Sequence, residues 1–301
     1  MKVRIGYGLG VRTRLSTPLF GEVVDRLEAH RFDSLWLSER LSSDAPDPVV
    51  ALAYAAGRTT NLKLGTSVMV LPGRNPVVLA KELATLATMS GGRFLPAFGL
   101  GAVDPVEQAG FGVTRQERAP RFDEMLAIMR ACWTGEAVHH AGNHHRIDGA
   151  VVHPVPGRLE VWLGGNAPSE LRRVGRLADG WLPSFVTPDD ADSGRQVIEA
   201  VLAEHDRTID DDHYGVLIPY SEGTVPEALL ASIGARRPDL DDPTVLVPTS
   251  LDALGSLIER FIAVGTTKFV VLPLAEPRDA DGWAAHIDDV ARVLLPLERT
   301  L

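Results

Sequence analysis

The chain has 301 residues, of which 45% are hydrophobic and 23% charged, a composition typical of a globular enzyme with a large core. Its formal net charge of −10 argues against a nucleic-acid partner, which would require a basic face. No apolar run is long enough to span a membrane, and the single cysteine, Cys132, excludes an internal disulfide. A cysteine-poor chain whose first residues already follow a strand pattern is expected in the cytoplasm.

The first half of the chain alternates short apolar segments with longer amphipathic ones. The apolar segments predict strands at 3–9, 33–37, 62–68 and 93–99. The amphipathic segments predict helices at 18–30, 47–60, 76–89 and 115–133. Proline lies in the first turn of the first three of these helices, a position that suits its fixed backbone angle.

The second half resumes this alternation after a polar connection at 135–156 that is rich in histidine and glycine. Strands are predicted at 159–164, 180–183, 213–220 and 268–273. Helices are predicted at 169–177, 189–206, 251–264 and 281–297. The stretch 222–247 holds several prolines and predicts an irregular insertion after the seventh strand, with room for one short helix.

Eight strand–helix units with nearly continuous apolar strands predict a parallel sheet that is buried on both faces. Eight such units favour closure into a (β/α)8 TIM barrel in the α/β class over an open doubly wound sheet. Gly6, Gly8 and Gly10 alternate along the first strand and do not open a helix, so a Rossmann nucleotide site is not expected. The pattern predicts one domain over residues 1–301.

Functional residues of such a barrel gather at the carboxyl-terminal ends of its strands. Glu39 and Arg40 follow the second strand. They are interpreted either as a surface ion pair or as groups for proton transfer and substrate anchoring. Gly99 and Gly101 end the fourth strand, where they either relieve crowding or let a planar ring lie against bare backbone.

Gly164, Gly165 and Asn166 follow the fifth strand and directly precede a helix. Free N–H groups at a helix start attract phosphate, and glycines allow a close approach. A tight turn with Asn166 or Ser169 as the helix N-cap explains the same pattern equally well. No metal site is expected, because the histidines of the polar connection lack the cysteine or carboxylate partners that complete a tetrahedral set.

Several runs, taken together, resemble the bacterial luciferase-like superfamily, and most closely its coenzyme F420-dependent branch in actinobacteria. The runs that carry this resemblance are Leu64-Gly65-Thr66-Ser67-Val68, Arg74-Asn75-Pro76, Leu83-Ala84-Thr85-Leu86, Ser90-Gly91-Gly92-Arg93-Phe94, Gly99-Leu100-Gly101, Arg121-Phe122-Asp123-Glu124, Trp162-Leu163-Gly164-Gly165 and Ala178-Asp179-Gly180-Trp181.

The resemblance implies a luciferase-like TIM barrel that binds coenzyme F420. It implies a non-proline cis peptide at Ser67-Val68, supporting the deazaflavin ring from behind. It also implies that Gly99 and Gly101 lie against the cofactor, that Gly164, Gly165 and Asn166 hold its phosphate, and that the protein forms a homodimer.

Two positions depart from the sugar-phosphate dehydrogenases of this branch. Their Asp-His pair after the second strand is Glu39-Arg40 here, and an arginine cannot serve as an ordinary general base. Their glutamate after the fourth strand falls on Ala102, with Asp104 nearby as a substitute. Glu39 is therefore the candidate for proton transfer, and Arg40 for binding an anionic substrate or a cofactor oxygen.

The function expected from this resemblance is F420-dependent oxidoreduction, with a hydride moving between deazaflavin C5 and a small organic substrate. One alternative is an FMN-dependent monooxygenase on the same barrel. The other, suggested by the missing Asp-His pair, is a non-catalytic protein that binds or carries a flavin or deazaflavin.

Overall fold

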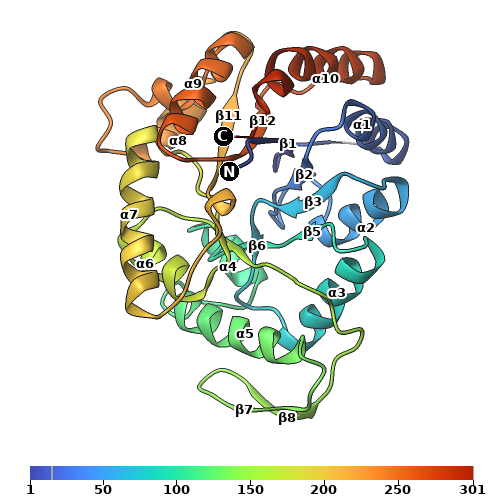
Figure 1. Ribbon diagram of the computed structural model, residues 1–301, viewed down its shortest axis with the longest axis vertical. Helices are drawn as coiled ribbons and strands as arrows, with labels where there is room; N and C mark the ends of the chain where they lie inside the picture. The colour runs from blue at the N-terminus through green and yellow to red at the C-terminus, as the bar shows by residue number, and fades with distance from the viewer. Residues whose placement is uncertain (15, 301) are drawn as a thin grey trace.

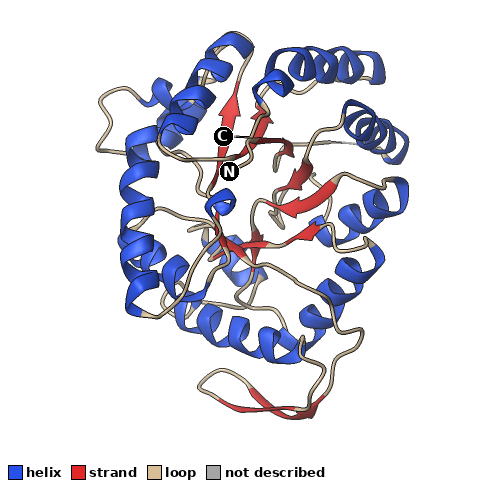
Figure 2. Ribbon diagram, viewed as in Figure 1, coloured by secondary structure: helices blue, strands red, loops and turns tan. Residues whose placement is uncertain are grey.

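The computed structural model describes residues 1–14 and 16–300. A ring of strands forms its centre and helices surround the ring, as Figures 1 and 2 show. The barrel strands are β1 (Arg4–Leu9), β2 (Ser34–Leu37), β3 (Lys63–Thr66), β4 (Met69–Val70), β5 (Phe94–Leu95), β6 (Ala97–Gly99), β9 (Trp162–Leu163), β10 (Gly180–Trp181), β11 (Gly215–Tyr220) and β12 (Lys268–Pro273). The α-helices are α1 (Thr17–His30), α2 (Pro48–Arg58), α3 (Pro76–Met89), α4 (Pro105–Gly110), α5 (Arg118–Cys132), α6 (Pro168–Leu177), α7 (Pro188–Glu204), α8 (Glu227–Arg236), α9 (Leu251–Ala263) and α10 (Ala280–Leu294).

The strands close into the predicted barrel. One parallel sheet has the order β11-β12-β1-β2-β3-β5 and a second has the order β10-β9-β6-β4. The chain itself joins the two sheets, because β3 leads directly into β4 and β5 leads directly into β6. Parallel bridges between Trp181 and Tyr214 and between Ser184 and Leu217 connect the β10 segment to the β11 segment. Every strand of the ring is thereby joined to its neighbours, and the expected α/β barrel is confirmed.

Successive side chains of a strand point to opposite faces, so the barrel has two separate cores, one outside and one inside the ring of strands. On β1, Ile5 and Tyr7 are fully buried in the large core that includes residues of the surrounding helices. The alternate side chains of the strands face the barrel interior, where Trp36 and Trp162 form the centre of a second cluster. Small residues are needed around these rings: a Cβ on Gly65 would lie 2.2 Å from the ring of Trp36.

Two elements were not predicted. The polar connection forms a hairpin of β7 (Val138–Ala141) and β8 (Arg146–Ala150), which projects away from the barrel beyond α5 (Figure 1). Its strands are largely exposed and lack the apolar alternation that marks a strand in sequence. The short helix α4 was also missed; it begins after Asp104, whose side chain accepts a hydrogen bond from Val106 N.

The insertion after β11 contains one helix, α8, as expected, and short 3-10 turns occur at Asp211–His213, Pro243–Leu246 and Leu295–Leu297. The insertion has a small apolar core of Val225, Ile233, Leu246 and Val247. Phe185 and Leu274, which follow β10 and β12, pack against this core. The insertion therefore lies over the carboxyl-terminal ends of those strands.

Cys132 is fully buried, as expected for an inert thiol in an apolar helix. Over the described part of the chain, no helix combines the length and the hydrophobicity needed to cross a bilayer.

Candidate active site

A cavity of about 530 Å3 opens at the carboxyl-terminal end of the barrel. Its walls come from β1, β2, β3, β4, β6, β9, β10, β11 and β12 or the segments that follow them, together with residues of α4, α5, α6 and α8. Of the residues that the sequence singles out, eight line it: Glu39, Arg40, Ser67, Val68, Gly99, Gly101, Gly164 and Gly165. Asn166 is not among the lining residues.

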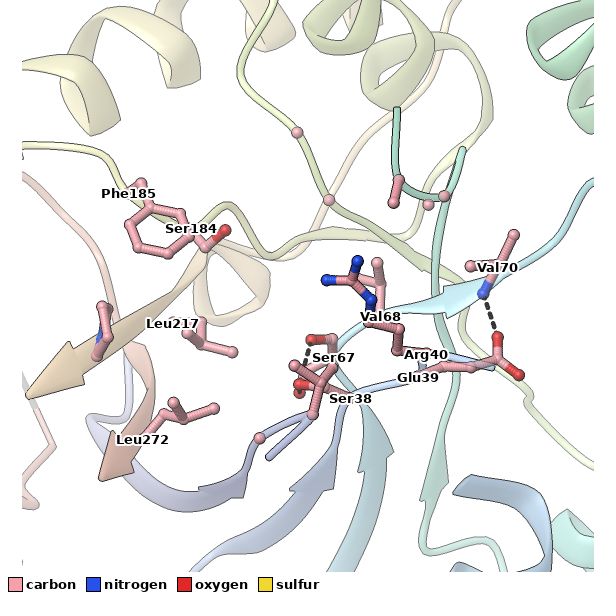
Figure 3. Close-up of a pocket in the computed structure, with 18 of the residues that line it drawn as sticks. Ser38, Glu39, Arg40, Ser67, Val68, Val70, Ser184, Phe185, Leu217 and Leu272 are labelled. Carbon is pink, nitrogen blue, oxygen red and sulfur yellow. Dashed lines mark hydrogen bonds between the residues drawn. The ribbon is translucent and has the colours of Figure 1, made fainter. Parts of the chain in front are cut away.

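Val68 forms the centre of one wall. The peptide bond between Ser67 and Val68 is cis, so the cis bond that the resemblance implied is present. Ser38 supports this bulge from β2, donating a hydrogen bond from its Oγ to Ser67 O at 3.1 Å (Figure 3). A Cβ on Gly99 would lie 2.6 Å from Val68 Cγ2, and one on Gly164 would lie 3.2 Å from Val68 Cγ1. Glycines at the ends of β6 and β9 therefore make room for the Val68 side chain.

The loop after β6 is held rigidly. Gly101 has a φ of +83°, a conformation that favours glycine. The guanidinium of Arg118, on α5, donates through Nη1 to Gly101 O at 2.7 Å and to Ala102 O at 3.0 Å. Arg118 is buried, so the carbonyls of this loop are tied to the helix layer. The backbone beside Val68 is thereby fixed.

Glu39 and Arg40 do not pair with each other. The carboxylate of Glu39, only 4% exposed, is ion-paired with Arg74. Its second oxygen accepts a hydrogen bond from Val70 N at 2.7 Å (Figure 3). Burial raises the pKa of Glu39, and the charge of Arg74 opposes that rise. Both carboxylate oxygens are engaged, which favours a holding role at the β2–β4 junction over proton transfer.

Arg40 points toward α4. Its Nη2 lies 3.1 Å from Asp104 Oδ2, and its Nε lies 3.8 Å from Glu107 Oε1. Asp104 is also the N-cap of α4 and does not line the cavity, so its position does not suit the proton-transfer role of the family glutamate. Glu107 is nearly buried and accepts N–H bonds from Leu41 and Ser42. Arg40 is therefore the member of the pair that is positioned to meet a ligand.

The segment after β9 has its helix-start amides already bonded. The N–H groups of Asn166 and Ala167 donate to Glu170 Oε2 at 3.1 and 3.0 Å. The N-cap is Ala167, so the alternative assignment of that role to Asn166 or Ser169 is wrong. A carboxylate of the chain itself thus occupies the place where the sequence predicts phosphate. Phosphate binding here stays a prediction.

Sequence reasoning missed the opposite wall. Phe185, Leu217 and Leu272 lie across the cavity from Val68 (Figure 3). Phe185 follows β10, Leu217 lies within β11 and Leu272 lies near the end of β12. The candidate residues from sequence ended with those that follow the fifth strand. Glu276, three residues after β12, also lines the cavity. Extending the strand-end rule to the last strand would have found it.

Away from the cavity, Glu160, Asp210 and His213 each place one potential metal-ligand atom within 4.8 Å of the others. Arg158 lies among them, 2.6 Å from Glu160 and 3.0 Å from Asp210. An ion-pair network therefore accounts for this group in the structure.

Comparison with known proteins places this barrel in a family. A family model described as luciferase-like monooxygenase matches residues 15–237, about three quarters of the chain. An F420-dependent glucose-6-phosphate dehydrogenase of Mycobacterium avium is 26% identical over 257 residues, covering 77% of this chain and 76% of that protein. An enzyme of the same name from Nakamurella multipartita is 31% identical over 196 residues, covering 60% of this chain and 56% of that protein.

Among solved structures, an F420-dependent secondary alcohol dehydrogenase in complex with an F420-acetone adduct superposes with a TM-score of 0.80. The two chains are 19% identical, and the match covers 99% of this chain and all of the other, so it supports the fold. The resemblance to the F420-dependent branch is confirmed, since both curated relatives carry that cofactor in their names. The chain belongs to the luciferase-like monooxygenase family.

Proposed function

We propose that the protein is a coenzyme F420-dependent oxidoreductase that transfers a hydride between the deazaflavin ring and a small organic substrate. When bound, a deazaflavin supplies two-electron hydride chemistry at C5 and reacts poorly with oxygen. The chain would bind and orient the ring, exclude water and hold the phosphate tail.

The observation that carries this proposal is the wall around Val68. Gly99, Gly101 and Gly164 present backbone without side chains; the Val68 side chain packs against Gly99 and Gly164, and the Val70 side chain packs against Gly101. Larger residues at Gly99 and Gly164 would push Val68 out of its place, so these glycines keep one wall of the cavity open to a planar ring. The residues present therefore fit a flat, tricyclic cofactor.

Charged groups also suit an anionic cofactor. Arg12, Arg40, Arg173 and Arg236 all line the cavity. Arg173 is nearly buried on α6, the helix that follows the Gly164-Gly165-Asn166 segment in the sequence. The cofactor phosphate would be held by the amides of that segment once Glu170 releases them, with Arg173 supplying positive charge. Arg40 would bind an oxygen of the cofactor or the substrate.

The proposal is tested by following the visible absorbance of oxidised F420 with a panel of alcohols and carbonyl compounds, in the absence of oxygen and flavin. Anaerobic, substrate-dependent change is the expected result. A requirement for oxygen together with reduced FMN would contradict the proposal and favour a monooxygenase. Cofactor binding without turnover of any compound would favour a carrier.

A further inference from the structure

We propose that the substrate is an apolar carbonyl compound, or the corresponding alcohol, and that Glu276 is the catalytic residue that exchanges the proton with its oxygen. The inference rests on the proposed function and specifies the other half of the same cavity.

The wall opposite Val68 is mainly aliphatic and aromatic, with Ser184 and Ser232 as its uncharged polar residues. Its apolar residues come from four separate elements: Phe185, Leu217, Pro219, Leu229, Ile233, Leu272 and Leu274. Below them lies the interior cluster with Trp36 and Trp162, which closes the floor of the cavity. The several hydroxyl groups of a sugar in this half would lose their hydration and find few hydrogen-bond partners, which is unfavourable. An apolar substrate would bury its surface here at a gain.

The cations of this half are at its rim. Arg12 and Arg236 are both exposed, and the guanidinium of Arg236 lies 5.7 Å from the centre of the Phe185 ring. They are placed to meet an anionic group that extends out of the cavity, not the reacting end of a substrate inside it.

Four glutamates line the cavity, and three are committed to other partners. Glu39 is bonded by Arg74 and Val70 N, and Glu107 by the amides of Leu41 and Ser42. Glu170 accepts two amides at the start of α6. Glu39 and Glu107 therefore have charged or N–H partners on both carboxylate oxygens, and Glu170 uses Oε2 for its two amides, so these groups hold the backbone in place.

Glu276 is different. Its carboxyl is partly buried and has no basic residue within ion-pair distance among the described residues. Its side-chain partner is the hydroxyl of Thr13, which is itself almost fully buried and donates to Oε1. Thr13 is held in turn by a hydrogen bond from its N–H to Gly10 O at 3.1 Å. The turn after β1 therefore fixes the carboxyl at the cavity wall.

The protonation of Glu276 agrees with this role. Burial raises the pKa of Glu276, and the hydrogen bonds from Thr13 and from the backbone of Gly10 oppose the rise. A carboxyl that keeps its proton to a higher pH is the appropriate donor to an oxygen that gains negative charge.

In the direction of reduction, the hydride adds to the carbonyl carbon and the C=O π electrons move to the oxygen. The O–H bond of Glu276 breaks as its proton passes to that oxygen, giving the alcohol and a carboxylate. When bound, reduced F420 would supply the hydride and release one N–H proton, leaving oxidised F420. Solvent receives that proton and returns one to Glu276, so atoms and charge balance. Oxidation of the alcohol is the reverse, with the carboxylate as base.

The test measures anaerobic oxidation of reduced F420 by cyclohexanone, 2-octanone and acetophenone, and reduction of oxidised F420 by glucose 6-phosphate. We expect turnover of at least one ketone and little with the sugar phosphate. Glu276→Gln should lower kcat for the ketone by about 100-fold or more, while F420 affinity measured by fluorescence and the Tm stay unchanged. Glu227→Gln, on the exposed first turn of α8, is the matched control and should behave as the wild type.

The pH profile separates catalysis from positioning. The wild-type rate of reduction should fall as pH rises through the raised pKa of Glu276, and this limb should be absent from Glu276→Gln. Thr13→Ala should shift the limb, whereas Thr13→Ser should restore it.

A wild-type rate and profile in Glu276→Gln would overturn the role of Glu276. Tight F420 binding with sugar-phosphate turnover, or with no ketone accepted, would overturn the substrate class. If the wild-type protein does not bind F420, the proposed function is overturned, and this inference with it.

Discussion

Val68 Cγ2 lies 2.6 Å from the position that a Cβ atom on Gly99 would occupy. That separation is too short for two carbons, so the wall of the cavity depends on a glycine at this position. Gly99→Ala should displace the stiff, β-branched Val68 side chain and destabilise the protein by about 1–3 kcal/mol. F420 affinity should fall with it. Urea unfolding and fluorescence titration measure the two effects.

The control for this change is Gly57→Ala. Gly57 lies in α2, and a Cβ there would meet no atom within 4 Å. Alanine is favoured over glycine in a helix by about 1 kcal/mol, so this variant should be as stable as the wild type or slightly more so. The double variant Gly99→Ala/Val68→Ala should recover part of the lost stability. If Gly99→Ala alone is as stable as the wild type, the wall rearranges around the added Cβ atom without cost, which would contradict this prediction.

The Glu170 carboxylate accepts hydrogen bonds from the backbone amides to which the cofactor phosphate is expected to bind. Glu170→Gln retains a hydrogen-bond acceptor but removes the negative charge, so F420 should bind several-fold more tightly at low salt. The gain should shrink as salt screens the charges. Titrations at two ionic strengths measure it, with Glu227→Gln as the matched control. Equal affinities of Glu170→Gln and the wild type would place the phosphate elsewhere.

The ion pair between Arg74 and the buried Glu39 joins the ends of β2 and β4. Arg74→Ala would leave a buried carboxylate with a single N–H partner and should cost about 3–5 kcal/mol of stability at neutral pH. Glu39→Gln should cost less, because the amide keeps the hydrogen bond from Val70 N.

The pH dependence of Arg74→Ala has a definite sign. Burial already raises the pKa of Glu39, and losing Arg74 removes the main opposing effect. A carboxyl whose folded pKa is raised favours the folded state most at low pH and less as pH rises through that pKa. The stability deficit of Arg74→Ala should therefore grow between acidic and neutral pH. A deficit independent of pH would mean that lost packing of the arginine, not charge, is the cause.

Glu28 gives a pH effect of the opposite sign. Its carboxylate accepts N–H bonds from Thr60, Asn61 and Leu62, joining α1 to the segment before β3. Burial raises its pKa, but these hydrogen bonds outweigh burial and lower the pKa to about 2. The carboxylate therefore contributes stability above the ordinary glutamate pKa that is lost as pH falls toward 2.

Glu28→Gln should accordingly cost about 1–2 kcal/mol at pH 7. The difference from the wild type should vanish as acid protonates Glu28 in both folded and unfolded chains. Unfolding free energies measured from acidic to neutral pH test this. A deficit that persists at the acidic end would show that the carboxylate charge is not what these amides require.

Local patterns predicted the barrel and one wall of the cavity. Strand periodicity identified the eight units, and the runs around Val68, Gly99 and Gly164 identified the wall opposite the apolar half. Glu39 and Arg40 were singled out as neighbours, yet their contacts diverge because successive side chains in extended chain point to opposite sides. The partners that decide their roles, Arg74 and Asp104, are distant in sequence.

The apolar wall was not predictable in the same way. Phe185 and Leu274 reach the cavity because the insertion with α8 folds over the barrel, and its small core depends on contacts between segments far apart in the chain. The bond from Glu170 to the start of α6 was hidden because the N-cap is Ala167, which lacks the hydroxyl that marks a capping box in sequence. The hairpin β7–β8 lacked apolar alternation.

The most direct test of the central claim is fluorescence titration of the purified protein with coenzyme F420 and, separately, with FMN. The glycine-lined wall around Val68 and the F420-dependent relatives predict saturable F420 binding at micromolar Kd or tighter, with FMN clearly weaker. FMN affinity equal to or greater than that for F420 would contradict the account and indicate a flavin-dependent monooxygenase.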